Sequence, residues 1–278
     1  MKIEPLVIGD LVAKIPVMQG GMGVGISLSG LAGADIIVSG AGLPADLPKY
    51  VKGTDTKLAP IVSSVKSTQV IMKYWLKKYE RLPDAVVIEG PLAGGHLGFT
   101  REQAEHPGIL HYDEEVRKIL QCVKEIGEEH HMRIPVIMAG GIYIRADMEH
   151  YLEMGISGVQ MATRFVTTYE CDADDAYKQS YINARKEDIV IVQSPVGMPG
   201  RAILNSFMQK AKDEKIPHGR CHCCISTCNP AQTPYCITDA LVNAATGHIE
   251  DALLFCGANA YRAEKLEYVK DIMAEFAP

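Results

Sequence analysis

Short runs of apolar and β-branched residues recur through the N-terminal part of the chain, and most are followed by a stretch compatible with a helix. This alternation is typical of parallel strands joined by crossover helices. Runs such as Val86-Val87-Ile88 are hydrophobic without interruption, as a strand buried on both faces requires. We therefore predict six core strands, at Pro16–Gln19, Asp35–Ser39, Leu58–Ser63, Ala85–Glu89, Pro135–Ala139 and Gly158–Thr163.

A doubly wound sheet would give the same alternation, but two features favour a barrel. Leu6–Ala13 has the pattern of a hairpin that turns at Gly9-Asp10, which suits a plug for one mouth of a barrel. Glycine-rich phrases directly follow several of the predicted strands, and barrels build their active sites at the C-terminal ends of strands. We expect an α/β, TIM-barrel-like parallel β/α fold, shortened to about six core strands.

The alternation of strands and helices stops at about Tyr169. Ser194–Arg201 reads as a glycine-punctuated loop, and it is followed by a cysteine cluster and by helices over about 237–250 and 260–276. The chain has no sequence repeat or flexible linker, so these residues are expected to extend the barrel rather than form an independent domain. The predicted organisation is a barrel-like domain over 1–168 and a helical, cysteine-rich cap over 169–278.

The composition is that of a globular enzyme. Of the 278 residues, 47% are hydrophobic and 22% are charged. A formal net charge of −6 provides no basic field for phosphate backbones, so we expect no nucleic-acid partner. The residues Met1–Pro5 do not begin the apolar run of a signal peptide, and no segment approaches the ~18 to 20 apolar residues that a bilayer needs. We expect a cytoplasmic protein without a membrane partner.

Four phrases, taken in order, resemble the signatures of the nitronate monooxygenase family, which includes 2-nitropropane dioxygenase-like proteins and is similar to FMN-dependent enoyl-acyl carrier protein reductases. They are Ile15–Gly23, Ile88–Gly98, Met138–Ile142 and Gly158–Phe165. The resemblance implies an FMN-dependent oxidoreductase with a small-molecule substrate and with dioxygen or NAD(P)H as the other reactant. It also implies a catalytic histidine at His96.

The chain departs from this family after Ala34. Ser27–Ala34 continues straight into Asp35–Gly40, where family members usually carry two more strand-helix units. A pair of such units needs on the order of 60 residues. Without them a single chain cannot close an eight-stranded barrel, so its two edges must be covered, paired with another copy in a homo-oligomer, or joined in a smaller barrel.

The small residues at the strand ends are the candidate flavin site. Glycines there let the backbone approach a flat ring, and the last two strands of a barrel commonly bind a phosphate through backbone N–H groups. Ordinary tight turns are the alternative explanation for each glycine pair. The candidate cofactor residues are Gln19, Gly20, Gly21, Met22, Glu89, Gly95, Ala139, Gly140, Gly141, Gln160, Ala162 and Thr163.

His96 is the candidate base. It lies in Gly94-Gly95-His96-Leu97-Gly98, after a predicted strand, where an imidazole can reach the mouth of the barrel. A pKa near neutrality suits it to remove a proton from carbon. A loop histidine bonded to a backbone carbonyl is the alternative. Glu89 is expected either to orient His96 or to bond the ribityl hydroxyls, or else to cap a turn.

A cysteine cluster in the cap needs a separate explanation. Cys221, Cys224, Cys228 and Cys236 have the spacing C-x2-C-x3-C-x7-C, which would let several thiolates converge on an iron–sulfur cluster or a zinc ion. Reduced thiols in a turn-rich loop are the alternative. His222 and Cys223 lie within the same segment and make the ligand set ambiguous.

The leading functional hypothesis is oxidation of a small nitronate or nitroalkane by dioxygen through FMN, with His96 as the base. An NAD(P)H-dependent reductase of enoyl thioesters or quinones is the alternative within the same class. A non-catalytic, shortened flavin-binding or oligomer-forming remnant is the alternative from another class.

Overall fold

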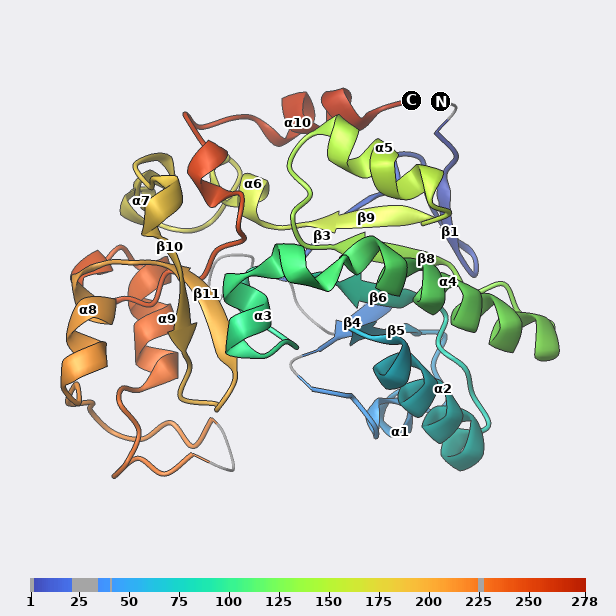
Figure 1. Cartoon of the computed structure of the whole chain (residues 1–278), viewed down its shortest axis with the longest axis horizontal. Helices are drawn as coiled ribbons and strands as arrows, with labels where there is room; N and C mark the ends of the chain where they lie inside the picture. Colours follow the sequence, from blue (N-terminus) through green and yellow to red (C-terminus); the bar gives the residue numbers. More distant parts are fainter. Residues whose placement is uncertain (1–2, 22–34, 41, 225–227) are drawn as a thin grey trace.

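A computed structural model of the chain describes residues 3–21, 35–40, 42–224 and 228–278 (Figure 1). Its centre is a parallel sheet with the strand order β3-β9-β8-β6-β5-β4. All six predicted core strands are present, with bounds within two residues of those expected. They are β3 (Val17–Gln19), β4 (Ile36–Ser39), β5 (Lys57–Val62), β6 (Val86–Glu89), β8 (Val136–Ala139) and β9 (Gly158–Met161).

The pairing of β3 with β9 identifies this sheet as part of a barrel. The first core strand lies beside the last, with Val17 opposite Val159, as in the closure of a barrel. The sheet is nevertheless open, because its two edges in the described part of the chain are β3 and β4. These strands flank the junction at which the sequence resemblance led us to expect the loss of two strand-helix units. The six strands therefore form a curled half-barrel, and the expected TIM-barrel-like fold is confirmed.

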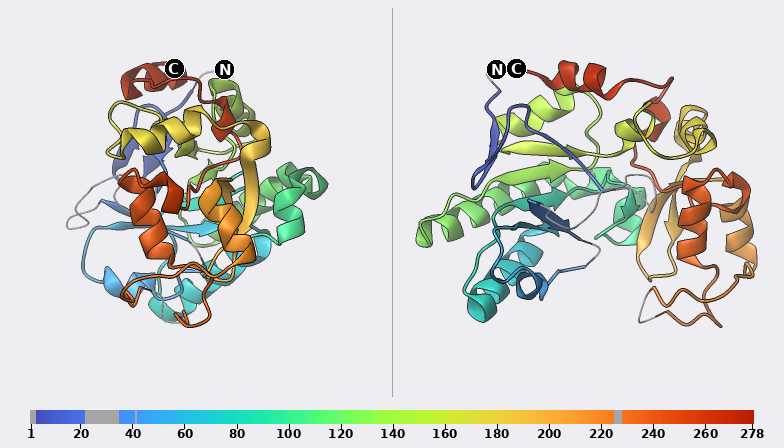
Figure 2. Two further views of the ribbon diagram at one scale, coloured as in Figure 1. Left: turned by 90° about the vertical axis from the view of Figure 1, so that its left-hand side faces the viewer. Right: turned by 180° about the vertical axis from the view of Figure 1, so that it is seen from behind.

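Alternate residues of the strands face two different layers. On the outer face, residues such as Val86 and Ile88 pack with the helices. On the inner face, Val87 and Ile137 pack instead with the N-terminal hairpin. The hairpin consists of β1 (Leu6–Ile8) and β2 (Leu11–Ala13), and it lies at the end of the sheet opposite the cap (Figure 2). The sequence pattern predicted a plug for one mouth of a barrel, and the hairpin packs on inner-face residues at that end of the sheet.

The outer face is covered by helices that the chain places between the strands. The helix α2 begins after Ser64, whose side chain accepts a hydrogen bond from the backbone of Ser67, and its residue Trp75 is fully buried. None of the described helices has the length and apolar character needed to span a membrane. The helices and helical turns of this part are α1 (Leu47–Tyr50), α2 (Val65–Tyr79), α3 (Arg101–Glu105), η1 (Pro107–Leu110), α4 (Tyr112–Glu129), α5 (Arg145–Glu153) and α6 (Thr163–Val166).

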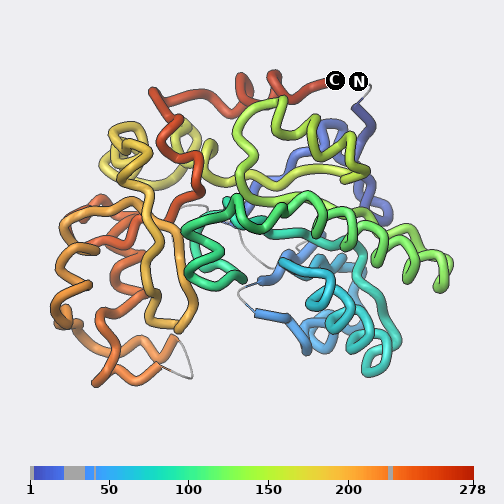
Figure 3. Tube along the Cα trace, in the orientation of Figure 1, coloured from blue at the N-terminus to red at the C-terminus, as the bar shows by residue number. Residues whose placement is uncertain are grey.

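The last helix, α10 (Val269–Phe276), returns to the barrel and packs beside α5 (Figure 3). Ile272 and Phe276 are fully buried in the outer core, and Glu275 forms an ion pair with Arg164 at 2.7 Å. The prediction of one helix over 260–276 is wrong in its first half, where only the single turn η4 (Ala260–Arg262) forms. The division of the chain into two parts at residue 168 stays a prediction. The helix α10 belongs to the C-terminal part in sequence but packs on the barrel side of the molecule.

The cap contains an antiparallel sheet that the sequence pattern did not reveal. Its order is β10-β11-β7, and its strands are β10 (Ile189–Gln193), β11 (Pro199–Ile203) and β7 (Gly95–His96). Pro199 and Gly200 are of types depleted from strands, which explains why this segment was predicted to be a loop. The helices and turns of the cap are α7 (Asp175–Ile182), η2 (Lys186–Asp188), α8 (Ser206–Asp213), α9 (Ile237–Ala245) and η3 (Ile249–Asp251).

Candidate functional site

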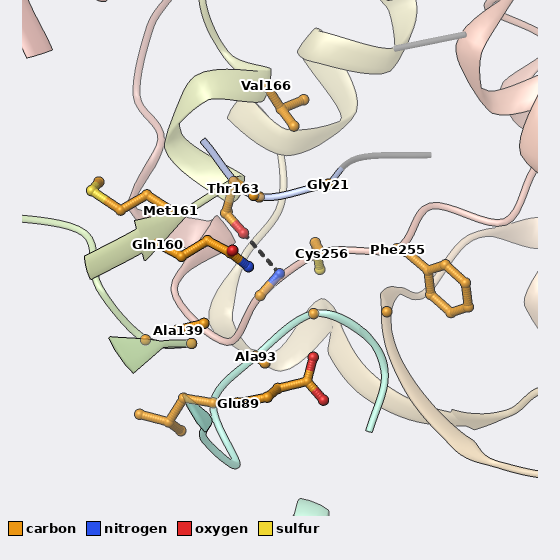
Figure 4. Close-up of a pocket in the computed structure, with 18 of the residues that line it drawn as sticks. Gly21, Glu89, Ala93, Ala139, Gln160, Met161, Thr163, Val166, Phe255 and Cys256 are labelled. Atoms are coloured by element: carbon orange, nitrogen blue, oxygen red, sulfur yellow. Dashed lines mark hydrogen bonds between the residues drawn. The ribbon is translucent and has the colours of Figure 1, made fainter. Parts of the chain in front are cut away.

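A cavity of about 320 Å³ lies between the C-terminal ends of the core strands and the cap. Figure 4 shows side chains from both parts around it, with Gln160 and Thr163 on one side and the Glu89 carboxylate on the other. Most of the candidate site residues predicted from the sequence line this cavity. They are Gly20, Gly21, Glu89, Gly95, His96, Ala139, Gly140, Gly141, Gln160, Ala162 and Thr163.

The period of two along each strand explains which polar residues reach the cavity. Val87 faces inward, and Glu89, two residues later on β6, therefore faces inward too. Gln160 lies on the inner side of β9 in the same way. Gln19 shares the outer face with Val17, because the residue between them, Met18, packs inward. Gln19 is exposed and is not among the residues that line the cavity. Met22, the remaining candidate, lies outside the described residues.

Two glycines of the site adopt backbone conformations that favour glycine. Gly140 has a φ of 94°, and a Cβ atom there would approach the backbone nitrogen of Ala93 to 2.8 Å. Gly95 has a φ of 68°, and among the described residues a Cβ atom there would have no neighbour within 4 Å. The loop after β8 therefore packs directly on the backbone before His96, while the surroundings of Gly95 are open.

His96 is held between the barrel and the cap. It belongs to the short strand β7, in which His96 pairs with Gly200 of β11. Its Nε2 lies 2.7 Å from the hydroxyl oxygen of Ser194, and its ring packs edge-on against Phe255 with 5.0 Å between the ring centres. Burial lowers the pKa of His96 below its usual value. The imidazole is therefore mainly neutral at pH 7, which is the form that can accept a proton.

Glu89 lies in a less polar environment than a strand-end carboxylate usually does. Burial raises its pKa to about 7, and a hydrogen bond from the backbone of Gly98 only partly opposes this effect. The hydrogen-bond partner of His96 is Ser194 and not Glu89. Glu89 is therefore a cavity-lining acid whose protonation changes near neutral pH, rather than the group that orients His96.

The segment Gly257-Ala258-Asn259 closes the cavity on the side of the last two core strands. The backbone N–H of Gly257 donates to Thr163 Oγ1 at 3.0 Å. The Asn259 side chain donates through Nδ2 to the carbonyl of Gly141 at 2.6 Å. Asn259 precedes the turn η4, but its side chain does not cap that turn. This segment instead joins the loops that follow β8 and β9.

Several cavity residues come from the cap and were missed by the sequence analysis. Tyr177 and Tyr181 are spaced as residues on one face of a helix, and their hydroxyl groups lie 3.0 Å apart. Tyr181 also donates to the carbonyl of Phe255. Both tyrosines, Phe255 and Cys256 line the cavity. A spacing of four residues is compatible with one helix face, but it does not identify what that face covers.

Arg201 connects the cap hairpin to the backbone that leads to His96. Its guanidinium is buried and donates to the carbonyls of Pro91 at 2.8 Å and Ala104 at 2.9 Å. Burial lowers the pKa of Arg201 below its usual value. Because its bonds run to carbonyl groups of two other segments, Arg201 fixes the position of the β11 strand relative to the loop before His96.

The cysteine ligand set predicted from the sequence does not form. Cys221, Cys224, Cys228 and Cys236 line one cavity, but in the described part of the chain no three of them bring their sulfur atoms within 4.8 Å of one another. Cys221 and Cys224 are exposed. Sequence spacing places thiols in one segment without fixing the direction in which each side chain points, and the expected iron–sulfur or four-thiol zinc site is not supported.

Comparisons with known proteins agree with this geometry. A probable nitronate monooxygenase of Staphylococcus saprophyticus is 32% identical over 48% of this chain and 36% of its own length. Another, of Staphylococcus haemolyticus, is 28% identical over 68% of this chain and 48% of its own. The chain therefore spans less than half the length of these relatives.

Solved structures give the same picture of the fold. FabK from Thermotoga maritima matches with a TM-score of 0.63 and 25% identity, over 87% of this chain and 66% of FabK. The nitroalkane oxidase of Streptomyces ansochromogenes matches with a TM-score of 0.61 and 19% identity, over 88% of this chain and 65% of its own. The model of the nitronate monooxygenase family matches residues 33–278, and the chain belongs to that family.

Proposed function

We propose that the cavity binds FMN and that the protein oxidises a small nitroalkane or nitronate with dioxygen, with His96 as the base. The observation that carries this proposal is the position of His96, a half-buried neutral imidazole at the wall of the cavity lined by the other predicted residues. Family membership supports an oxidoreductase, while the substrate and the cofactor are part of the proposal.

The residues of the cavity fit a flavin in their chemistry. A Cβ atom on Gly21 or Gly95 would meet no atom of the described residues within 4 Å, so with respect to these residues the backbone at both positions is open to a flat ring. No hydrogen bond from another described residue occupies the Gln160 side chain, whose amide is available to a carbonyl or ring nitrogen of a ligand. Gly140, Gly141 and Thr163 would hold the phosphate end, where backbone N–H groups gather.

The protein's own groups account for the proton chemistry of this reaction. FMN, when bound, accepts an electron pair from the substrate and passes electrons to dioxygen. The His96 imidazole removes the proton on the carbon that carries the nitro group, and Ser194 fixes the orientation of the ring. Glu89, with its pKa of about 7, supplies a second site that can hold a proton beside the reacting groups. Tyr177, Tyr181 and Phe255 limit access of water.

Reduction of an enoyl thioester by NAD(P)H is the competing reaction, and it needs a channel for an extended acyl chain beside the flavin. The cavity has a volume of about 320 Å³, at the lower end of the range for ligand pockets. A flavin would occupy most of this volume, so the choice between the two substrates rests on the rate measurements below.

The first test is the absorbance spectrum of the purified chain after incubation with FMN and removal of excess cofactor. We expect the bands of bound flavin and turnover of a nitronate with dioxygen. Protein that stays colourless would point to a non-catalytic remnant and overturn the proposal. Faster NADH-dependent reduction of an enoyl thioester would assign the competing activity.

The second test separates the base from the rest of the site. His96→Asn is expected to slow oxidation of a neutral nitroalkane by at least about 100-fold, because proton removal then lacks its base. The rate of oxidation of the preformed nitronate should fall much less, because the proton on its carbon has already been removed. His150→Asn is a matched control on the exposed surface of α5. Equal losses with both substrates would exclude His96 as the base.

A further inference from the structure

A second cavity, of about 330 Å³, lies in the cap beside the segment between α8 and α9. The proposed oxidation uses none of its residues. Its lining holds an unusual number of side chains that bind metal ions. They are His218, Cys221, His222, Cys223, Cys224, Cys228 and Cys236.

Two side chains of this cavity and one from the cavity that adjoins it are close enough to share one cation. The ligand atoms of His222, Cys236 and Asp239 all lie within 4.8 Å of one another. Two atoms bound to one tetrahedral zinc ion lie about 3.4 to 3.8 Å apart, since the metal–ligand bonds are about 2.0 to 2.3 Å long. The three ligand atoms are therefore near the spacing of a metal site, and small side-chain movements would bring them to it.

One contact within the cluster must lengthen when a cation binds. Nε2 of His222 is 2.6 Å from Oδ1 of Asp239, and the two atoms would have to separate by about 1 Å. The side chains of His222 and Asp239 are 49% and 37% exposed, so a small rotamer change achieves this without moving the core. An ordinary ion pair between these two residues is the competing explanation of their contact.

The fold presets two of the three ligands. Cys236 is the residue before the first turn of α9, and Asp239 lies in that turn. Residues three apart at a helix start lie on the same side of the helix. The helix itself is fixed by buried residues such as Ala240 and Ala244. Only His222 has to come from the cysteine-rich loop.

The other histidine of this cavity is already engaged. Both ring nitrogens of His218 face backbone carbonyls, Nδ1 at 3.0 Å from Gly219 and Nε2 at 3.1 Å from Pro230. Neither nitrogen is therefore directed to a metal ion. His222 is therefore the histidine whose imidazole lies close to both a thiol and a carboxylate.

We propose that His222, Cys236 and Asp239 bind a thiophilic divalent cation of the zinc type, with a loop thiol or a water as the fourth ligand. Imidazole, thiolate and carboxylate are the ligands that zinc accepts, and the two anionic groups neutralise a divalent charge. This ligand set differs from the four-cysteine set suggested by the spacing.

The site would act on structure rather than on the reacting atoms. Pro195 lines the same cavity, and its neighbour Ser194 contacts His96. A cation that holds the loop of His222 against α9 would therefore stabilise the part of the cap that lies next to the turn carrying Ser194. This role goes beyond the proposed oxidation and does not depend on it.

The test uses the full chain without a metal-binding tag, loaded with zinc chloride, desalted and analysed for metal. We expect about one zinc ion per chain. Cys236→Ser and His222→Ala should each lose it, while Cys171→Ser, a half-buried cysteine elsewhere in the cap, should keep it. With cobalt(II) in place of zinc, a thiolate-to-cobalt absorption band should appear in the wild type and be missing in Cys236→Ser.

Far-ultraviolet circular dichroism shows whether each variant is folded, and zinc should raise the melting temperature of the wild type but not of Cys236→Ser. Zinc content that is negligible in the wild type, or equal in wild type and Cys236→Ser, would overturn the proposal. Retention by both His222→Ala and Asp239→Ala, with loss in a triple Cys221, Cys224 and Cys228 to serine variant, would overturn the proposed ligand set.

Discussion

Nε2 of His96 lies 2.7 Å from Oγ of Ser194, and this contact joins the loop that follows β6 to the turn of the cap hairpin. The two residues are 98 positions apart in the sequence. Ser194 is buried, so its hydroxyl has little access to water as an alternative partner. The cap therefore determines the orientation of the imidazole that the barrel supplies.

Ser194→Ala should reduce the activity of His96 without removing it. Loss of one hydrogen bond costs about 0.5 to 1.5 kcal/mol, so we expect kcat/KM for a nitroalkane to fall about 2- to 12-fold. The value for a preformed nitronate should change less, because the base is not needed for that substrate. Ser180→Ala, at a helix surface serine of the cap, is the matched control. Steady-state rates of all three proteins with both substrates check this, and equal rates for wild type and Ser194→Ala would contradict it.

Glu89 should make the stability of the protein depend on pH. Burial raises its pKa from 4.5 to about 7, so the folded state holds a proton that the unfolded state has released between these values. The stabilisation of the folded state by this bound proton is fully present below pH 4.5 and is lost as the pH rises through 7. A glutamine side chain cannot ionise, so the variant Glu89→Gln does not lose this stabilisation. At pH 8 its free energy of unfolding should therefore exceed that of the wild type by up to about 3 kcal/mol.

Urea unfolding at pH 5 and pH 8 measures this difference. Glu129→Gln, an exposed residue at the end of α4, is the matched control and should shift neither value. If Glu89→Gln and wild type differ by the same free energy at both pH values, Glu89 ionises normally and the cavity is wetter than its geometry indicates.

Asn259→Ala tests whether the segment that closes the cavity helps to hold the cofactor. The variant loses the hydrogen bond from Nδ2 to the carbonyl of Gly141, so the loop after β8 is less well fixed. We expect FMN to bind about 10-fold more weakly, measured by fluorescence titration. Asn243→Ala removes a similar bond, from Nδ2 to the carbonyl of Asp251, away from the cavity. Equal affinities in the two variants would show that Asn259 acts only on stability.

The six core strands were predictable because each is short, apolar and followed by a small or polar residue. That pattern reflects burial on both faces, which requires no knowledge of the partners of a strand. The candidate residues at the strand ends then meet in one cavity because parallel strands bring their C-terminal ends to one edge. Gln19 shows the limit of this reasoning, since only the inward position of Met18 reveals that Gln19 lies on the outer face.

The cap could not be predicted in the same way. The strand β7 has two residues and forms only because β11 lies beside it. Pro199 and Gly200 have low strand propensity, and Gly200 pairs not only with nearby Val192 but also with His96, which lies in a distant part of the sequence. The metal-binding residues show a similar limit, because Asp239 joins His222 and Cys236 through the position of α9 and not through a spacing motif.

Arg201→Met should destabilise the junction between cap and barrel. The guanidinium donates to the carbonyls of Pro91 and Ala104, and the substitution leaves these buried acceptors without a partner. Each unsatisfied group costs about 1 to 3 kcal/mol, so we expect the free energy of unfolding to fall by at least about 2 kcal/mol. Arg117→Met, at an exposed position of α4, should change it by less than about 0.5 kcal/mol. Urea unfolding at pH 7 measures both, and a similar small loss in the two variants would mean that the cap is positioned without Arg201.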